Sequence, residues 1–354
     1  MTELSLGARV ARSFRDTNYL GTLGRSLDGR PIQCSIYVTD RCNLDCHYCT
    51  EYDNSERHPP LEAILERLRH IRKLGVIRVA FVGGEPLLHP DIVEMVRYAR
   101  ELGLATSLTT NGFPLSRRLL DGLVEAGLEV MQISVDRMTP SATTRKSVKS
   151  VARRIEMVAN SPIKLHLTGV LCADTIEESR QVLAYGLSLG VPTEVRLVHS
   201  GPDGMMRVPP GDRQKLRELL EWMRAEKHAG AKIHTTDAIL QYQLDLIDGA
   251  PSDTWTCSAG YKIFFVSAKG KFMECSMRPT EHDILDMTQA DLGQYFHKKD
   301  CQNGCGVYCA VGISMFRDHP FRYVAGEIVP RARQLAREVR AGARPAPEAA
   351  PVGA

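Results

Sequence analysis

Three cysteines, Cys42, Cys46 and Cys49, lie within eight residues of one another near the start of the chain. Their C-x3-C-x2-C spacing follows a β-branched run that ends near Thr39, which predicts a loop after a strand. Thiolates are the usual ligands of iron–sulfur clusters, and a cubane cluster normally takes four of them. Three close thiolates therefore predict a cluster with one open iron. The alternative is a zinc ion bound by these cysteines and His47.

Five more cysteines fall between positions 257 and 309. They are Cys257, Cys275, Cys301, Cys305 and Cys309. Strand-like runs at 262–266 and 271–273 flank a turn at Ala268-Lys269-Gly270, which predicts a β-hairpin that brings the first two thiols together. Clustered cysteines in a chain without an export signal favour metal binding over disulfides. An iron–sulfur cluster and a zinc ion both remain open here, because zinc also takes four thiolates.

Polar or glycine residues follow the ends of further predicted strands. Gly83-Gly84-Glu85-Pro86 follows the second strand, Thr109 to Gly112 the third, and Ser134 and Asp136 the fourth. The candidates on the fifth and sixth strands are His166, Thr168, Arg196 and His199. Side chains at the carboxyl ends of parallel strands face the mouth of a barrel, where ligands bind. Asn, Ser and Asp in such places are also common helix N-caps, so both roles remain open.

The first cysteine motif and the Gly83-Gly84-Glu85-Pro86 motif, thirty-four residues beyond Cys49, together resemble the radical S-adenosylmethionine (radical SAM) superfamily. This resemblance implies a [4Fe–4S] cluster on Cys42, Cys46 and Cys49, whose open iron binds S-adenosyl-L-methionine. In that family one electron from the cluster cleaves the cofactor's sulfur–carbon bond, and the 5′-deoxyadenosyl radical abstracts hydrogen from a substrate. The cofactor-binding residues that it implies are Tyr48, Gly83, Gly84, Glu85, Pro86, Thr110, Asn111, Ser134 and Asp136.

The second cysteine group is similar to the SPASM and twitch extensions of that superfamily, and its five cysteines fit the shorter twitch type. The similarity implies one auxiliary [4Fe–4S] cluster held by four of these cysteines. The spacing of the last three departs from the usual C-x2-C element, so which four bind is open. The spare thiol is expected to be structural, or else to donate hydrogen to a substrate radical. The candidates for that catalytic role are Cys301, Cys305 and Cys309.

The elements that position these residues alternate along the chain. The predicted strands are 35–38, 76–82, 105–109, 130–135, 164–171 and 194–198, and the helices between them are 61–74, 91–102, 116–126, 148–159 and 176–189. This order predicts an α/β fold with a parallel sheet, which could be open or a barrel. The resemblance implies a partial (β/α)6 TIM-like barrel with a small C-terminal cysteine-rich auxiliary-cluster domain.

Five segments are expected along the chain. They are an N-terminal extension (1–33), the barrel (34–230), the auxiliary domain (231–318), a C-terminal helix (319–340) and a disordered tail (341–354). A formal net charge of +3 is too small to indicate a nucleic-acid partner. No run approaches the roughly 20 apolar residues that cross a bilayer, and residues 1–16 lack a signal-peptide core. We therefore expect a cytoplasmic protein without nucleic-acid or membrane partners.

The expected function is a radical SAM oxidation, dehydrogenation or rearrangement of a small molecule or peptide in natural-product or cofactor biosynthesis. A flavodoxin- or ferredoxin-type reductant would be its electron donor. Only 33 residues precede Cys34, too few for the peptide-binding domain of many relatives, which weakens the alternative of a ribosomal-peptide maturase. Two further alternatives remain: a radical epimerase with a cysteine hydrogen donor, and a non-catalytic iron–sulfur or zinc regulatory protein.

Overall fold

The computed structural model describes residues 24–25, 28–171, 175–197, 210–250, 254–323 and 326–327. The predictions for residues 1–23, for His199, for residues 328–340 of the C-terminal helix and for the tail at 341–354 lie outside these ranges. Within the described part, no helix has both the length and the apolar content needed to cross a membrane.

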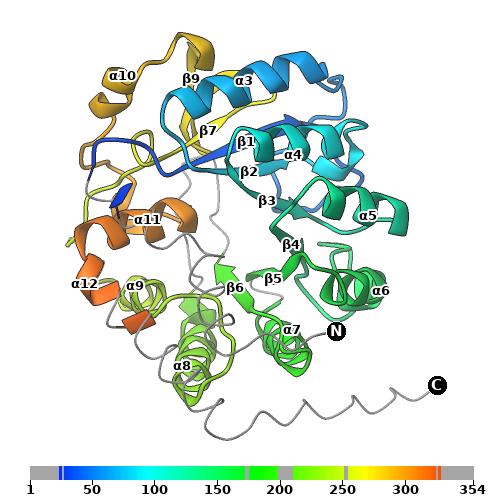
Figure 1. The fold of residues 1–354 in the computed structure, drawn as a ribbon. Coiled ribbons are helices and arrows are strands. Elements are labelled where there is room, and N and C mark those ends of the chain that lie inside the picture. Colours follow the sequence, from blue (N-terminus) through cyan, green and yellow to red (C-terminus); the bar gives the residue numbers. More distant parts are fainter. Residues whose placement is uncertain are drawn as a thin grey trace, which may run out of the picture.

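Six parallel strands pair in chain order and form the centre of the fold (Figure 1). They are β1 (Gln33–Thr39), β2 (Arg78–Gly83), β3 (Ala105–Thr110), β4 (Val130–Ser134), β5 (Lys164–Leu171) and β6 (Thr193–Leu197). The crossover helices are α3 (Leu61–Lys73), α4 (Ile92–Glu101), α5 (Arg117–Glu125), α6 (Val148–Ala159) and α7 (Ile176–Ser188). Strand order and helix placement confirm the predicted α/β class and the partial barrel.

Alternating burial along the strands decides which side chains reach the interior of the barrel. In β3, β4 and β5, fully buried residues alternate with half-buried ones. Leu108, Met131 and Leu167 belong to the buried set and pack in the core that the crossover helices cover. Members of the other set near the carboxyl ends of the strands, such as Thr109 and Thr168, line the inner cavity described below.

The chain beyond β6 extends the same core. The helices α8 (Arg213–Ala229) and α9 (Asp237–Ile247) pack against each other. Leu220 of α8 and Leu240 of α9 share a buried cluster with Val195 of β6. The helices on either side of residue 230 therefore share one buried cluster.

Three more strands continue the barrel sheet on its other side. β7 (Ile263–Val266) pairs in parallel with β1, and the predicted hairpin is present as an antiparallel pair of β7 and β8 (Lys271–Cys275). The strand β9 (Arg278–Asp283) completes an order β6-β5-β4-β3-β2-β1-β7-β8-β9. The short helices α10 (Gln289–Gln294) and α12 (Pro320–Tyr323) and the longer α11 (Tyr308–Asp318) follow. The cysteine-rich segment is thus built onto the barrel sheet.

Candidate active site

A cavity of about 350 Å³ lies at the carboxyl ends of the parallel strands. All six barrel strands and β7 contribute to its wall, and the loop after β1 contributes Cys42, Cys46 and Cys49. Of the other expected cofactor-binding residues, Tyr48, Gly83, Gly84, Glu85, Thr110, Asn111 and Ser134 also line it. Pro86 and Asp136 are buried behind the wall. The structure therefore gathers most of the predicted site in one place.

Glu85 fixes the end of β2 to the end of β3. Its Oε1 accepts hydrogen bonds from Thr110 Oγ1 (2.6 Å) and from the Leu87 N–H (3.0 Å), and its Oε2 accepts from the Asn111 N–H (2.7 Å). Burial raises the pKa of this carboxyl, while these donors act in the opposite direction. Glu85 is 1% exposed, so its carboxylate is held in one orientation at the cavity wall.

The two glycines before Glu85 allow β2 to approach the cysteine loop. A Cβ on Gly83 would lie 2.1 Å from the Thr39 carbonyl oxygen, and one on Gly84 would lie 2.3 Å from that of Arg41. The Gly84 N–H donates to the Thr39 carbonyl at 2.9 Å, and the Glu85 N–H donates to that of Arg41 at 2.8 Å. The absence of side chains at these two positions therefore leaves room for the backbone that begins the cysteine loop.

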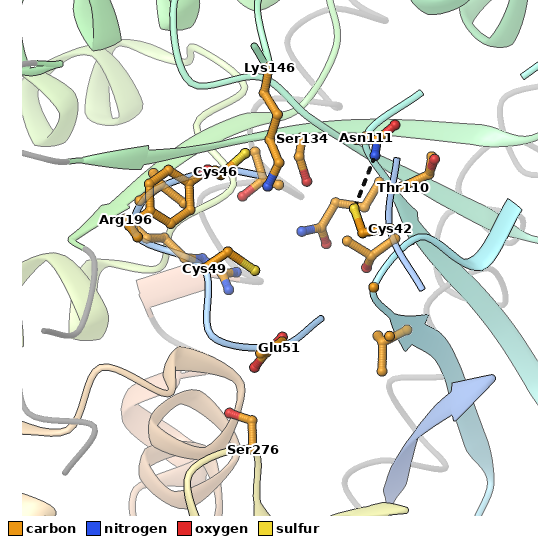
Figure 2. Close-up of a pocket in the computed structure, with 18 of the residues that line it drawn as sticks. Cys42, Cys46, Cys49, Glu51, Thr110, Asn111, Ser134, Lys146, Arg196 and Ser276 are labelled. Atoms are coloured by element: carbon orange, nitrogen blue, oxygen red, sulfur yellow. Dashed lines mark hydrogen bonds between the residues drawn. The ribbon is translucent and has the colours of Figure 1, made fainter. Parts of the chain in front are cut away.

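Hydrogen bonds reach the first cysteine sulfur from two sides. The Leu44 N–H donates to Cys42 Sγ at 3.4 Å, and the Asn111 side-chain amide lies 3.9 Å from the same sulfur (Figure 2). Asn111 also donates to Asn43 Oδ1 at 2.8 Å. Donors directed at a sulfur stabilise a thiolate, which is the form that binds iron.

Tyr48 and Asp136 are joined by a hydrogen bond behind the cavity wall. The Tyr48 hydroxyl donates to Asp136 Oδ2, and the same carboxylate accepts from Thr144 Oγ1 (2.9 Å) and from the Val170 N–H (3.0 Å). Asp136 is 1% exposed. The structure therefore places Asp136 where it orients Tyr48 and Thr144, away from the cavity in which a bound cofactor would lie.

Two cations, Lys146 and Arg196, and one carboxylate, Glu51, complete the wall. Of these three residues, the sequence indicates only Arg196 as a candidate. Lys146 points into the cavity beside Ser134, and Arg196 and Glu51 approach from other sides (Figure 2). The Lys146 ammonium lies 5.4 Å from the centre of the Tyr48 ring. Although burial disfavours its charge, the nearby Tyr48, Asp136 and cysteines raise the pKa of Lys146. No local pattern marks Lys146 or Glu51, because both lie in irregular loops.

Among the described candidates of the last two strands, only Arg196 combines a charge with a place on the cavity wall. Its guanidinium pairs with Glu194 at 2.5 Å and lies 5.7 Å from the centre of the Tyr308 ring. Thr168 also lines the cavity, whereas the His166 ring instead lies 4.3 Å from that of His234. Arg196 is therefore held so that it can face an anionic ligand group.

Four of the five cysteines of the second group lie together and do not line the cavity of the first group. Cys257, Cys275 and Cys305 are buried in one cluster, and Cys301 is half-buried. The Cys257 N–H donates to Gln302 Oε1 at 3.1 Å, and the Tyr242 hydroxyl donates to the Cys305 carbonyl at 3.2 Å. Burial raises the pKa of the Cys305 thiol, and the charges of Cys257, Cys275 and Cys301 add to the effect. These four thiols are neighbours.

Cys309 differs from the other four members of that group because it lines the first cavity. It stands in the first turn of α11, next to Tyr308. Burial raises the pKa of its thiol, and the nearby Arg196 guanidinium lowers it. Cys309 therefore faces the space around Cys42, Cys46 and Cys49, although it also packs against the buried cluster that contains three of the other four thiols and lies near Cys275.

The donor sets fit iron–sulfur clusters better than single zinc ions. A zinc ion needs ligands that converge on one point at about 2.0–2.3 Å, and among the described residues no three His, Cys, Asp or Glu side chains do so. A cubane binds each thiolate through a different iron, so its ligands surround a volume. His47, the proposed fourth zinc ligand, is exposed and outside the cavity wall.

The partial barrel and the cysteine-lined cavity at its mouth define an iron–sulfur enzyme of the radical SAM type. Residues 36–184 match the family model described as "Radical SAM superfamily", which identifies this part of the chain as a radical SAM domain. Members of this superfamily use a [4Fe–4S] cluster and S-adenosylmethionine. The fit of Cys42, Cys46 and Cys49 to that cluster agrees with the match.

Individual relatives and solved structures agree with this assignment. A probable GTP 3′,8-cyclase of Saccharolobus solfataricus is 29% identical over 75% of this chain and 89% of its own length. A PqqA peptide cyclase of Bradyrhizobium diazoefficiens is 38% identical over 30% of this chain and 29% of its own length. The crystal structure of Streptococcus suis SuiB bound to its precursor peptide SuiA has a TM-score of 0.60 and 17% identity, over 83% of this chain and 70% of that one. The chain spans less than half the length of several curated relatives that it matches.

Proposed function

We propose that this protein abstracts a hydrogen atom from a small-molecule or peptide substrate bound in the cavity, and carries out an oxidation, dehydrogenation or rearrangement in cofactor or natural-product biosynthesis. The observation that carries the proposal is one cavity lined both by three cysteines on one loop and by the strand ends that face them. The relatives include proteins named for a nucleotide and for a peptide, so both substrate classes remain in the proposal.

Within this proposal Cys42, Cys46 and Cys49 hold the [4Fe–4S] cluster. The bound cluster and S-adenosylmethionine supply the hydrogen-abstracting radical. Glu85, Thr110, Asn111 and Ser134 would orient the cofactor from the ends of β2, β3 and β4, together with Gly83 and Gly84. Tyr48 would pack near its adenine. Pro86 and Asp136 would act from behind the wall, because neither reaches the cavity.

We assign the auxiliary cluster to Cys257, Cys275, Cys301 and Cys305. Their mutual proximity supports the assignment, as does Lys299, whose side chain is 1% exposed and pairs with Glu274 at 3.0 Å. Burial raises the pKa of Cys257, and the nearby Lys299 ammonium acts against that rise. A buried cation beside four thiolates would offset part of their negative charge. Such a cluster could accept the electron that a substrate radical gives up during a two-electron oxidation.

The place of Cys309 supports a second candidate, epimerisation. A cysteine that faces the cavity could give a hydrogen atom to a substrate radical on the side opposite to the abstraction. The sulfur radical left on Cys309 would then need one electron and one proton, which a flavodoxin- or ferredoxin-type reductant would supply through the auxiliary cluster. Incorporation of solvent deuterium at carbon, abolished by Cys309→Ala, would distinguish this reaction from oxidation.

The nine described cysteines are all free thiols, which supports a reducing, cytoplasmic location as part of the proposal. The test is anaerobic reconstitution followed by iron and sulfide analysis and by detection of 5′-deoxyadenosine after reduction with S-adenosylmethionine. We expect about eight irons per chain from two clusters, and loss of 5′-deoxyadenosine when Cys42, Cys46 and Cys49 are all changed to Ala. Cys34→Ala, which removes a core thiol of β1, is the matched control. Zinc at the first loop, or full activity of the triple variant, would overturn the proposal.

A further inference from the structure

The hydroxyl of Thr144 lies between a proposed iron ligand and a buried carboxylate. Its Oγ1 is 3.4 Å from Cys46 Sγ and 2.9 Å from Asp136 Oδ2, and Thr144 is 2% exposed. A hydroxyl has one proton to donate. Because a carboxylate only accepts, Thr144 donates to Asp136 here, and the thiol proton of Cys46 is the one directed at Thr144.

Binding of iron by Cys46 must change this arrangement. A thiolate ligand has no proton, so the Thr144 oxygen would face the sulfur with no hydrogen between them. The contact becomes favourable only if the Thr144 hydroxyl rotates and donates to the sulfur. Asp136 Oδ2 would then lose one of its two hydroxyl donors.

Tyr48 makes that rotation possible. Its hydroxyl donates to the same oxygen, Asp136 Oδ2, while Asp136 Oδ1 accepts from the Val170 N–H at 3.0 Å. Both carboxylate oxygens therefore keep a donor after Thr144 turns away. Buried polar groups that lose their last partner are costly, and this arrangement avoids that cost.

We propose that Thr144 is a positioning residue that donates a hydrogen bond to Cys46 Sγ when this sulfur binds iron, and that Tyr48 frees it to do so by holding Asp136. The inference rests on the proposed function, since it requires a cluster on Cys42, Cys46 and Cys49. Hydrogen bonds to ligand sulfurs and local charge are among the factors that set the potential of iron–sulfur clusters. Reduction adds negative charge, so a donor at the sulfur favours the reduced state.

The test is the midpoint potential of this cluster in the full-length, reconstituted protein. The potential is followed by electron paramagnetic resonance, and the signal is assigned by its change when S-adenosylmethionine is added. Thr144→Val keeps the shape of the side chain and removes the hydroxyl. We expect the ratio of reduced to oxidised cluster, measured at a fixed solution potential, to fall tenfold. For one electron this corresponds to a midpoint potential lower by about 59 mV. Thr144→Ser restores the hydroxyl and should match the wild type.

Tyr48→Phe tests the same set of hydrogen bonds from the side of Asp136. It should lower the potential in the wild-type background, because Thr144 is then drawn back to Asp136, and it should have no further effect in the Thr144→Val background. If Thr144→Val does not load with iron, the shift in Tyr48→Phe decides the question alone, and an unchanged potential there rejects the proposal.

Two other results would overturn the role of Thr144: a Thr144→Val potential equal to the wild type, or an equal shift in Thr144→Ser, which would assign the effect to packing. A wild-type protein that assembles no cluster at Cys42, Cys46 and Cys49 would instead reject the proposed function. A wild type that forms 5′-deoxyadenosine while its Thr144 variants keep an unshifted potential would reject only the role of Thr144.

Discussion

The backbone N–H of Asn111 donates a hydrogen bond of 2.7 Å to Glu85 Oε2, and this bond ties the end of one barrel strand to the end of the next. Asn111 in turn reaches Asn43 on the cysteine loop at 2.8 Å. Three successive strand ends are therefore linked through two side chains. The shape of the cavity depends on this link, because Glu85 and Asn111 are both buried and both line the cavity wall.

Replacing Glu85 by Gln should weaken this link. The variant exchanges one acceptor oxygen for an NH2 group, so at least one of the three donors around position 85 loses its partner. Leaving a buried donor unsatisfied costs about 1–3 kcal/mol. Denaturant unfolding of the metal-free protein should show a loss in that range, whereas Glu125→Gln, at an exposed helix position, should change the stability by less than about 0.5 kcal/mol. Equal stabilities of the two variants would contradict the role of Glu85.

Gly83→Ala should cost more than Gly103→Ala. Both glycines have a positive φ, +135° and +75°, so both substitutions carry backbone strain of about 1–3 kcal/mol. Only at Gly83 does the new Cβ meet another atom, the Thr39 carbonyl oxygen at 2.1 Å, whereas Gly103 has nothing within 4 Å. Overpacking adds about 1–3 kcal/mol, so unfolding free energies should differ by that amount. Iron content after reconstitution should fall in Gly83→Ala and stay unchanged in Gly103→Ala.

Lys262 should make the stability depend on pH above neutrality. Its ammonium is 1% exposed and donates to the carbonyls of Arg25 (2.6 Å) and Arg30 (3.1 Å), and burial lowers its pKa to about 8. The unfolded value is about 10.4, so between pH 8 and pH 10.4 the unfolded chain binds more protons than the folded one. The free energy of unfolding therefore rises with pH in this window, by no more than about 3 kcal/mol.

Lys262→Met should remove that rise. The measurement is the unfolding free energy at several pH values between 7 and 10.5, taken as the difference between wild type and variant so that other titrating groups cancel. Lys232→Met, at an exposed lysine, should keep the wild-type slope. A slope that persists in Lys262→Met would show that another group causes it.

Iron content should distinguish Cys309 from the proposed auxiliary-cluster ligands of the second group. Cys305→Ala removes a proposed auxiliary ligand and should lower the iron count from about eight to about four. Cys309→Ala should keep about eight, because this thiol lines the other cavity. Elemental analysis with Mössbauer spectroscopy of both variants distinguishes cluster loss from partial occupancy. Loss of four irons in Cys309→Ala would return Cys309 to the ligand set.

Much of the barrel could be predicted because its periodicity is local. The strand β5 and the helix α6 have the predicted bounds, and the other barrel elements differ by one or two residues at their ends. A glycine follows each of four crossover helices, and these glycines, Gly75, Gly103, Gly127 and Gly190, all have a positive φ, as a left-handed C-terminal cap requires. In each case a pattern within about fifteen residues contains the needed information.

The features that could not be predicted from the sequence depend on partners far away in the chain. Six positions of the helix α9 are buried, and one of them is the polar Gln243, so its sequence shows no clear amphipathic pattern. The helix α11 begins among the cysteines, and its segment therefore has an irregular pattern. Thr144 and Lys146 lie in a loop with no motif, and their contacts to Cys46, Asp136 and Tyr48 arise only when the loop folds over the first cysteine motif.

The parallel pairing of β1 with β7 has a consequence for any attempt to shorten this protein. β1 is an interior strand only because residues 263–266 hydrogen-bond along one side of it. A truncated chain that ends near residue 250 would leave that side as a bare edge, with unpaired amides and carbonyls next to the strand that leads into Cys42. Such a fragment would be prone to self-association, so the N-terminal cysteine loop and the C-terminal hairpin must be expressed as one piece.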